Sequence, residues 1–202
     1  MNKIFYIMGK SASGKDTIYN ELRNDKTLDL KTIPLYTTRP KRNGEVEGVD
    51  YHFITEEEIL PLKQRIIELR SYNTIHGVWK YLTVDSGELD GDKVFNYLMI
   101  GTLESYCKTK AYYESKGLKD CIVPIYIYVE DGIRLQRALD RERKQEYPKY
   151  QELCRRFLAD AEDFSTENLK RANIEVQYEN IQLNECMKRI KSMIKEQIEK
   201  LN

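Results

Sequence analysis

The residues best suited to chemistry begin with a glycine-punctuated segment close to the start of the chain. Residues Gly9 to Lys15 read Gly-Lys-Ser-Ala-Ser-Gly-Lys and fit the pattern G-x-x-x-x-G-K. Glycines let a backbone wrap around a polyphosphate with its amide N–H groups pointing inward, and a following helix adds partial positive charge. An apolar run precedes the segment and a helical pattern follows it, so we expect a phosphate-binding loop rather than a simple Gly/Ser turn. The expected phosphate-binding residues are Gly9, Lys10, Ser11, Ala12, Ser13, Gly14, Lys15, Asp16 and Thr17.

Lys15 is the expected catalytic cation of this loop, because an ammonium here can bridge phosphate oxygens and offset charge on a transferred phosphoryl group. The next position usually carries a Ser or Thr that holds Mg²⁺; here it is Asp16, followed by Thr17. Carboxylate oxygen is a good Mg²⁺ ligand, so we expect Asp16 or Thr17 to hold the metal. The other interpretation is that Asp16 is only a favourable acid in the first turn of a helix.

A second cluster of basic residues follows about two dozen residues later. Arg39 and Arg42 lie three residues apart in a loop that contains Pro40, and Tyr51 then opens a strand. Guanidinium groups grip phosphate through paired hydrogen bonds, and a tyrosine hydroxyl can add a further donor. The cluster therefore suits a monophosphate dianion; a solvated basic loop is the alternative.

Composition narrows the classes of partner. The chain has 202 residues, enough for one domain with a full core, and its 33 basic and 33 acidic side chains cancel. We therefore expect no nucleic-acid or membrane partner. The four cysteines lie far apart without a C-x-x-C pair, and the start of the chain has no signal-peptide pattern. These features predict a cytoplasmic protein with reduced thiols. The expected oligomeric state is a monomer or a homodimer.

Alternating apolar strands and helical patterns position these clusters. This alternation predicts an α/β fold, a mostly parallel sheet with helices on both faces. A β-rich stretch is expected over 31–84, with strands at 51–54 and 66–69. The other expected strands are 3–8, 94–100, 122–129 and 174–178. The expected helices are 15–23, a short one from 55, 103–116, 131–144, 150–169 and 183–201.

The segment from Thr37 to Phe53 resembles a long signature of one enzyme family. It reads TTRPKRNGEVEGVDYHF and is similar to the TTR-x-x-R-x-GE-x-x-G-x-DY-x-F signature of the guanylate kinase family. The members of that family are P-loop nucleoside monophosphate kinases. The resemblance implies a P-loop NTPase-type core at 1–32 and 85–202. It also implies a small β-rich subdomain for the nucleoside monophosphate (NMP) at 33–84 and a helical lid at about 141–157.

The resemblance also implies an activity: transfer of the γ-phosphoryl group of ATP to GMP, with Mg²⁺. In that role Arg39, Arg42 and Tyr51 would hold the acceptor phosphate. Glu68 would accept hydrogen bonds from guanine, and Tyr81 would supply a second phosphate-binding hydroxyl. Arginines around the lid would neutralise the transferring phosphates, with Arg141 and Arg156 as the expected catalytic pair beside Lys15 and Arg39; the other lid arginines are Arg143 and Arg155.

The chain departs from the family pattern at three positions. The family has a base-reading serine where this chain has Leu35, and two aspartates on a strand where this chain is matched to Asn96 and Leu98. These departures leave two rival functions open. One is a kinase for another (deoxy)nucleoside monophosphate, and the other is a non-catalytic guanylate-kinase-like interaction module.

Overall fold

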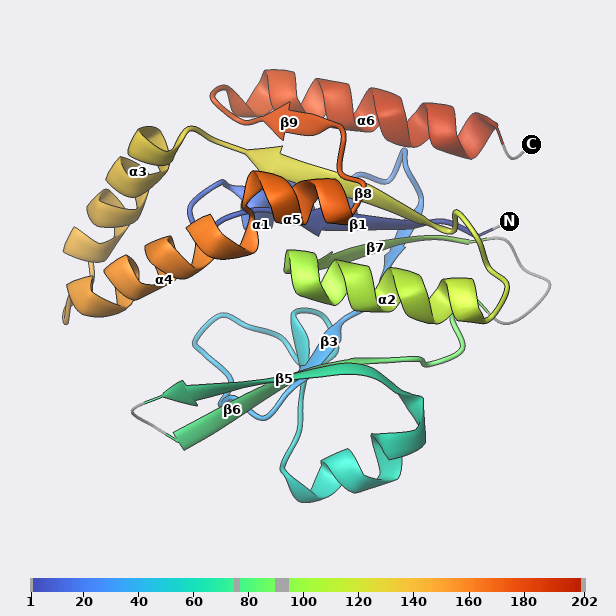
Figure 1. Ribbon diagram of the computed structural model, residues 1–202, viewed down its shortest axis with the longest axis horizontal. Helices are drawn as coiled ribbons and strands as arrows, with labels where there is room; N and C mark the ends of the chain where they lie inside the picture. Colours follow the sequence, from blue (N-terminus) through green and yellow to red (C-terminus); the bar gives the residue numbers. More distant parts are fainter. Residues whose placement is uncertain (1, 75–76, 90–94, 201–202) are drawn as a thin grey trace.

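In the computed structural model, two sheets lie on either side of helix α2 (Leu103–Ser115) (Figure 1). The structure describes residues 2–74, 77–89 and 95–200. The larger sheet has the order β2-β7-β1-β8-β9, and all its neighbouring strands are parallel. Its strands are β1 (Ile4–Met8), β2 (Leu30–Thr32), β7 (Asn96–Gly101), β8 (Ile122–Tyr128) and β9 (Gln177–Glu179).

Strand β1 lies at the centre of this sheet and has a hydrophobic core on each face. Ile4, Tyr6 and Met8 point to one core, and Phe5 and Ile7 point to the other, because successive side chains of a strand alternate. All five are completely buried, as expected for a parallel strand covered by helices on both sides.

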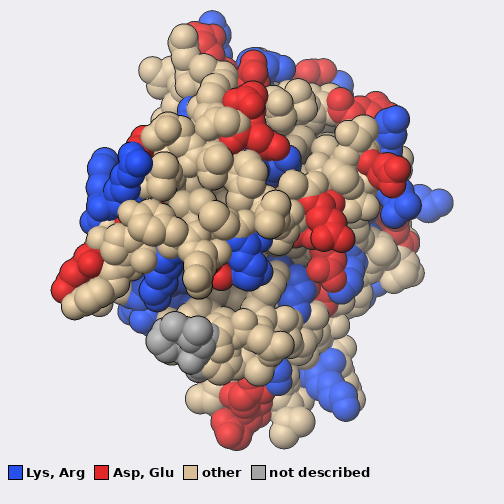
Figure 2. Space-filling view, turned by 60° about the vertical axis from the view of Figure 1, so that its left-hand side comes forward, with Lys and Arg blue, Asp and Glu red and all other residues tan. Residues whose placement is uncertain are grey.

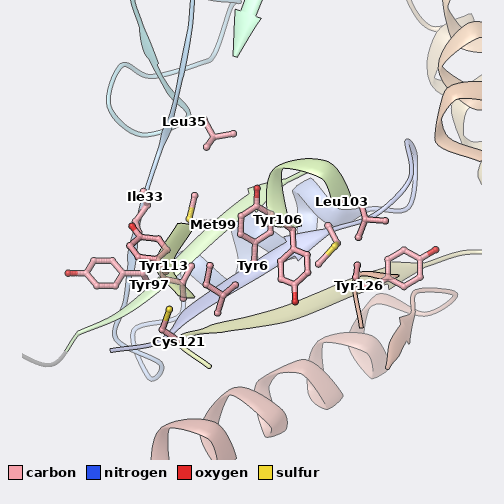
Figure 3. Packing of buried hydrophobic residues seen from close by; sticks show 14 of the residues in the cluster. Tyr6, Ile33, Leu35, Tyr97, Met99, Leu103, Tyr106, Tyr113, Cys121 and Tyr126 are labelled. Carbon is pink, nitrogen blue, oxygen red and sulfur yellow. The ribbon is translucent and has the colours of Figure 1, made fainter. Parts of the chain in front are cut away.

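Helices α1 (Lys15–Arg23) and α6 (Leu183–Glu199) cover one face of the large sheet. Their inward residues, such as Ile18 and Ile190, are fully buried. Helix α2 (Leu103–Ser115) and α5 (Thr166–Arg171) cover the other face. There the tyrosines Tyr6, Tyr106, Tyr113 and Tyr126 gather around Met99 and Cys121 (Figure 3), and burial raises the pKa of Cys121 to about 11.

The smaller sheet has the order β4-β3-β6-β5 and belongs to the segment predicted to form the NMP subdomain. Its strands are β3 (Leu35–Thr37), β4 (Tyr51–Phe53), β5 (Ile66–Thr74) and β6 (Gly77–Val84), and a 3-10 helix, η1 (Glu57–Arg65), connects β4 to β5. Leu35 and Tyr51 pack against the tyrosine-rich core, so the two sheets share a hydrophobic contact.

Helices α3 (Asp131–Arg143) and α4 (Tyr150–Asp163) form an antiparallel hairpin that projects from one end of the large sheet (Figure 1). This hairpin contains the predicted lid. None of the helices within the described ranges is long and apolar enough to cross a membrane.

The α/β architecture is confirmed, but several predicted boundaries are wrong. The strand expected over 66–69 continues to Thr74 as β5. The helix expected over 150–169 is two helices, because Ser165 caps α5 by accepting a hydrogen bond from the Asn168 N–H at 3.3 Å. The last strand begins at Gln177 rather than at residue 174, because pairing with β8 starts only opposite Tyr126. Val94, at the start of another expected strand, and Leu201, at the end of the last expected helix, lie outside the described residues.

Candidate functional site

The predicted phosphate loop connects the carboxyl end of β1 to the amino end of α1. Gly14 has a φ of 84° and Ala12 a φ of 62°, so the loop contains left-handed conformations on both sides of Ser13. A Cβ on Gly14 would lie 2.4 Å from Asn180 Nδ2, and one on Gly9 would lie 2.6 Å from the Ile127 carbonyl oxygen. Both glycines of the motif are therefore required by close approaches, and Gly14 is also required by its left-handed backbone conformation.

The side chain of Asn180 fixes the position of the phosphate loop. Asn180 follows β9, is buried, and donates from Nδ2 to the Ser13 carbonyl at 2.8 Å. The Ile18 N–H donates to the Gly14 carbonyl at 3.0 Å and closes the first turn of α1. The amides that precede Ile18 have no partner within the helix, so they are the ones offered to an anion.

The first half of the loop is clamped by the lid hairpin. Lys10 pairs with Asp131 at 3.2 Å, and the Ser11 N–H donates to Asp160 at 2.8 Å. Arg134, only 1% exposed, donates to the Ser11 carbonyl at 3.1 Å and to Asp160 at 3.3 Å. We call these five residues the loop clamp.

Sequence reasoning missed Arg134 and Asp160. An arginine in a helix as charged as α3 is typical of a solvated face, and Asp160 is 149 residues from its partner Ser11. The available signal was the spacing of Asp131 and Arg134 in the first turn of α3, where their side chains meet at 3.0 Å.

Of the four lid arginines, the structure brings two to the phosphate loop. Arg156 donates to the Ser11 Oγ at 3.0 Å, and Arg141 lines a cavity of about 160 Å³ between α3 and α4. Arg143 instead pairs with Asp140 at 3.6 Å, and Arg155 with Glu152 at 2.7 Å, both at exposed positions. The remaining cavity lining includes Arg134, Lys149, Phe157 and Ser11.

The lid side of the molecule is rich in positive charge next to a hollow. With that side turned forward, Lys and Arg side chains lie around a hollow near the middle of the face, and acidic side chains are spread more widely (Figure 2). Such a hollow suits a polyphosphate in a chain whose formal net charge is zero.

The expected metal ligands lie at the surface of the loop. Asp16 is exposed and one of its oxygens is 3.2 Å from Lys15 Nζ, while Thr17 next to it is also exposed. Within the described ranges there is no group of three or more His, Cys, Asp or Glu that could hold a metal ion. One carboxylate beside a phosphate site fits Mg²⁺, which is usually held by one or two carboxylates together with substrate phosphates and water.

Arg39 is the centre of the predicted acceptor cluster and is only 3% exposed. Its two terminal nitrogens donate to the Glu45 carboxylate at 2.8 and 2.7 Å, and this pairing holds the pKa of Glu45 below its usual value. The Arg39 guanidinium carbon lies 5.1 Å from the centre of the Tyr51 ring, and the Tyr51 and Tyr81 rings are 5.9 Å apart. Its Nε is buried without a hydrogen-bond partner among the described residues.

The other predicted acceptor residues are placed unequally. Tyr51 and Tyr81 lie in the same cluster as Arg39. Burial raises the pKa of Tyr51, Tyr81 raises it further and Arg39 lowers it, so the net effect is a rise and the hydroxyl stays protonated as a donor. Asp16 of the phosphate loop adds to this rise in the pKa of Tyr51. Arg42 contributes its backbone N–H, 2.7 Å from Glu45, and its side chain is exposed.

Glu68 is buried inside a polar network between the two sheets. Its Oε1 accepts from Ser105 Oγ at 2.7 Å and from Thr83 Oγ1 at 2.9 Å, and its Oε2 accepts from Arg70 Nε at 3.0 Å. Arg70 also reaches Thr102 at 3.1 Å, at the carboxyl end of β7. Sequence reasoning missed this arginine.

The match of Asn96 and Leu98 to functional positions is wrong. Strands β1 and β7 are parallel, and Met8, which enters the phosphate loop, pairs with Gly101. Asn96 is therefore at the opposite end of β7, where it accepts from the Lys3 N–H at 3.3 Å, and Leu98 is buried in the core beneath α1 and α6. The residues of this strand nearest the loop are Gly101 and Thr102. Leu35 is likewise a buried core residue (Figure 3).

Comparison with known proteins points in one direction. The family model described as guanylate kinase matches residues 1–78. The guanylate kinase of Mycoplasma mobile is 27% identical over 202 residues, which cover 98% of this chain and 95% of that protein. The guanylate kinase 2, chloroplastic/mitochondrial, of rice (Oryza sativa subsp. japonica) is 38% identical over 77 residues, which are 38% of this chain but only 26% of the rice protein.

The fold is also that of a solved structure. The crystal structure of guanylate kinase from Anaplasma phagocytophilum matches with a TM-score of 0.60 and 22% sequence identity, over 97% of this chain and 86% of that one. The family model thus covers the loop and the acceptor segment, and the structural match extends over nearly the whole chain.

Proposed function

We propose that the chain is a phosphotransferase of the guanylate kinase family, to whose members it is similar, and that it transfers the γ-phosphoryl group of ATP to GMP. The bond between the γ-phosphorus and the β–γ bridging oxygen breaks, a GMP phosphate oxygen forms the new bond, and ADP and GDP leave. One observation carries the proposal: the buried Nε of Arg39 has no hydrogen-bond partner among the described residues, and the Arg39 guanidinium lies 5.1 Å from the centre of the Tyr51 ring. The acceptor cluster therefore keeps a buried donor for a second phosphate group, in addition to the phosphate loop.

The donor phosphates are held by the loop backbone and Lys15. Gly14 lets the loop curl so that the free amides at the start of α1 point at the phosphates. Lys15 contacts Asp16 at 3.2 Å and is free to turn toward a phosphate oxygen, which carries more negative charge. A bound Mg²⁺ would neutralise phosphate charge, and Asp16 is the residue best placed to hold it, with Thr17 beside it.

The acceptor phosphate is held by Arg39, Tyr51 and Tyr81, with Arg42 reaching in from the exposed side of the loop. Glu45 fixes the Arg39 guanidinium through two hydrogen bonds, so little side-chain entropy remains to be lost on binding. The buried Nε of Arg39 is a donor that the described residues leave unused, and a phosphate oxygen would satisfy it.

The lid arginines stabilise the transferring group. Arg156 already reaches the loop at Ser11, and Arg141 lines the cavity beside it, so these two are assigned the catalytic role and Arg143 and Arg155 are not. Catalysis consists of in-line positioning and charge stabilisation, and closure of the hairpin excludes the water that would otherwise hydrolyse ATP. All four cysteines are free thiols, which is in keeping with a cytoplasmic enzyme.

The test is a coupled assay of ADP formation with Mg·ATP and, separately, GMP, dGMP, AMP, CMP and UMP. We expect acceptor-dependent turnover with GMP in the wild-type chain and a loss of at least a hundredfold in Lys15→Ala. Lys26→Ala is the matched control, because Lys26 is exposed beyond the end of α1. Full activity of Lys15→Ala would refute the mechanism. Turnover with another monophosphate but not with GMP would show that the chain is a kinase for a different acceptor. Nucleotide binding without turnover would indicate a non-catalytic module.

A further inference from the structure

Helix α1 ends in an arginine that the mechanism above does not use. Lys15 is the first residue of this nine-residue helix and Arg23 is the last, so the donor cation and Arg23 lie on one rigid element, about 12 Å apart along its axis. Ile18 and Leu22 between them are fully buried in the core under the large sheet. The position of Arg23 is therefore fixed relative to the phosphate loop.

The partner of Arg23 lies in the loop over 38–50 that joins β3 to β4, which we call the acceptor loop. Arg23 Nη1 is 3.4 Å from Asp50 Oδ1, and the two side chains are 22% and 29% exposed. The pair joins α1 of the core to the predicted NMP subdomain, across 27 positions of the chain. A pair this exposed adds only modestly to stability, so its main effect is on geometry.

Asp50 organises the part of the acceptor loop that holds the phosphate-binding side chains. Its Oδ2 accepts from the Val46 N–H at 2.7 Å, and its own N–H donates to the Val46 carbonyl at 3.0 Å. Val46 directly follows Glu45, which holds Arg39 through two hydrogen bonds, and Asp50 directly precedes Tyr51, whose ring centre is 5.1 Å from the Arg39 guanidinium. Both neighbours of Arg39 are thus adjacent to the residues that Asp50 ties together.

We infer that Arg23 is a positioning residue for phosphoryl transfer: through Asp50 it fixes the acceptor loop relative to the donor phosphates. This inference rests on the proposed transfer to a monophosphate. In-line transfer needs the two phosphate groups in register, and a misplacement of about 1 Å can cost about a hundredfold in rate. The rival interpretation is that Arg23 only compensates the negative end of the helix dipole, which affects stability and not the acceptor.

The experiment compares steady-state kinetics of variants that break the bridge from either side. Arg23→Met removes the cation, and Asp50→Asn removes the carboxylate charge but keeps an oxygen that can accept from the Val46 N–H. Each should raise KM for GMP about tenfold and leave KM for ATP within about twofold of wild type. Arg23→Lys should stay within about threefold of wild type in KM for GMP, because an ammonium still pairs with Asp50.

Lys191→Met is the matched control. Lys191 of α6 pairs with Asp25 at 2.7 Å, just past the end of α1, so this variant removes an ion pair from the same end of the helix without touching the acceptor loop. Its KM for GMP should stay within about twofold of wild type, with thermal unfolding recorded for every variant. An equal rise in KM for GMP in Lys191→Met and in Arg23→Met would overturn the inference.

The double variant Arg23→Met/Asp50→Asn shows whether the two residues act as one unit. Because both substitutions remove the same bridge, KM for GMP in the double variant should lie within about twofold of either single variant. Effects that multiply to about a hundredfold would show independent roles and overturn the inference. An unchanged KM for GMP in a folded Arg23→Met or Asp50→Asn would overturn it as well.

A binding measurement separates this role from the proposed transfer. Calorimetric titration of wild type and Arg23→Met with GMP and, separately, with ADP should show GMP bound about tenfold more weakly by the variant and ADP bound equally. If GMP binds but no acceptor is turned over, the transfer is refuted, and the ratio of the two GMP affinities still decides the role of Arg23. Equal GMP affinities would overturn that role and leave the transfer standing.

Discussion

Substitution of Arg134 by methionine tests whether the loop clamp organises the phosphate loop. Methionine has a similar length and no hydrogen-bond donors, so Arg134→Met removes the interactions without opening a large cavity. The substitution leaves the Ser11 carbonyl without its donor at 3.1 Å and Asp160 without its cation at 3.3 Å. It also removes the packing of the guanidinium, 4.2 Å from the centre of the Phe157 ring.

The structure sets the magnitude of the loss. Removing one partner of a buried pair costs about 3–5 kcal/mol, because the remaining charge is left uncompensated. Asp160 is nearly buried, at 17% exposure, so the loss of Arg134 leaves its charge largely uncompensated. Asp131 is 46% exposed and water can solvate it, so its contribution to the loss of stability is small. We therefore expect a loss of about 3 kcal/mol in the free energy of unfolding. For about 200 residues this corresponds to a Tm lower by about 6–12 °C.

The assay combines thermal unfolding with steady-state kinetics. Because Ser11 is held by both Arg134 and Asp160, the loop should become less ordered, and KM for ATP should rise about tenfold while KM for GMP stays constant. Arg143→Met on the same helix is the control, since Arg143 is exposed and pairs with Asp140 only at 3.6 Å; its effect should stay within about 0.5 kcal/mol. A Tm of Arg134→Met within about 2 °C of wild type would refute the clamp, and an unchanged KM for ATP would refute its link to the loop.

Three further outcomes follow from single residues. Gly14→Ala should weaken ATP binding at least tenfold in a nucleotide titration, because the new Cβ would meet Asn180 Nδ2 at 2.4 Å in a left-handed backbone; wild-type affinity would contradict this. The pKa of Glu45 is lowered by Arg39, so its carboxylate stabilises the fold above its unfolded pKa of about 4.3 and loses that effect as pH falls through the lower folded pKa. Denaturant titrations between pH 5 and pH 3 should therefore show a steeper loss for wild type than for Glu45→Gln, and parallel curves would refute the pairing. Ile190→Ala should cost about 2–5 kcal/mol in chemical denaturation, with KM values unchanged, because it empties part of the core beneath α6.

The features that could be predicted from the sequence are those built from neighbouring residues. The loop from Gly9 to Lys15 is recognisable because its glycines, its preceding strand and its following helix are adjacent in the chain. The same holds for the segment that contains Arg39 and Tyr51, where the strand and the loop lie within 20 residues. The α/β class followed from the alternation of apolar strands and helices, and the structure confirms it.

The features that could not be predicted depend on burial created by distant segments. Arg134 is in a charged helix and Arg70 in a strand of mixed polarity, yet the fold buries both beside carboxylates. Asn180 reaches Ser13 across 167 residues. The assignment of Asn96 to the functional edge failed for a related reason: the residue that faces the loop is decided by strand register, and β7 meets the loop at Gly101, five residues further on.

The loop clamp also determines which cations remain available to an anion. Lys10 and Arg134 lie at the loop, but Asp131 and Asp160 already neutralise them. Their charges therefore organise the loop and add little attraction for a phosphate. That attraction is left to the free amides at the start of α1, to Lys15, and to Arg141 and Arg156 of the lid. In a chain whose charges cancel overall, compensating the structural cations and leaving the functional ones beside a hollow concentrates positive potential where the donor phosphates bind.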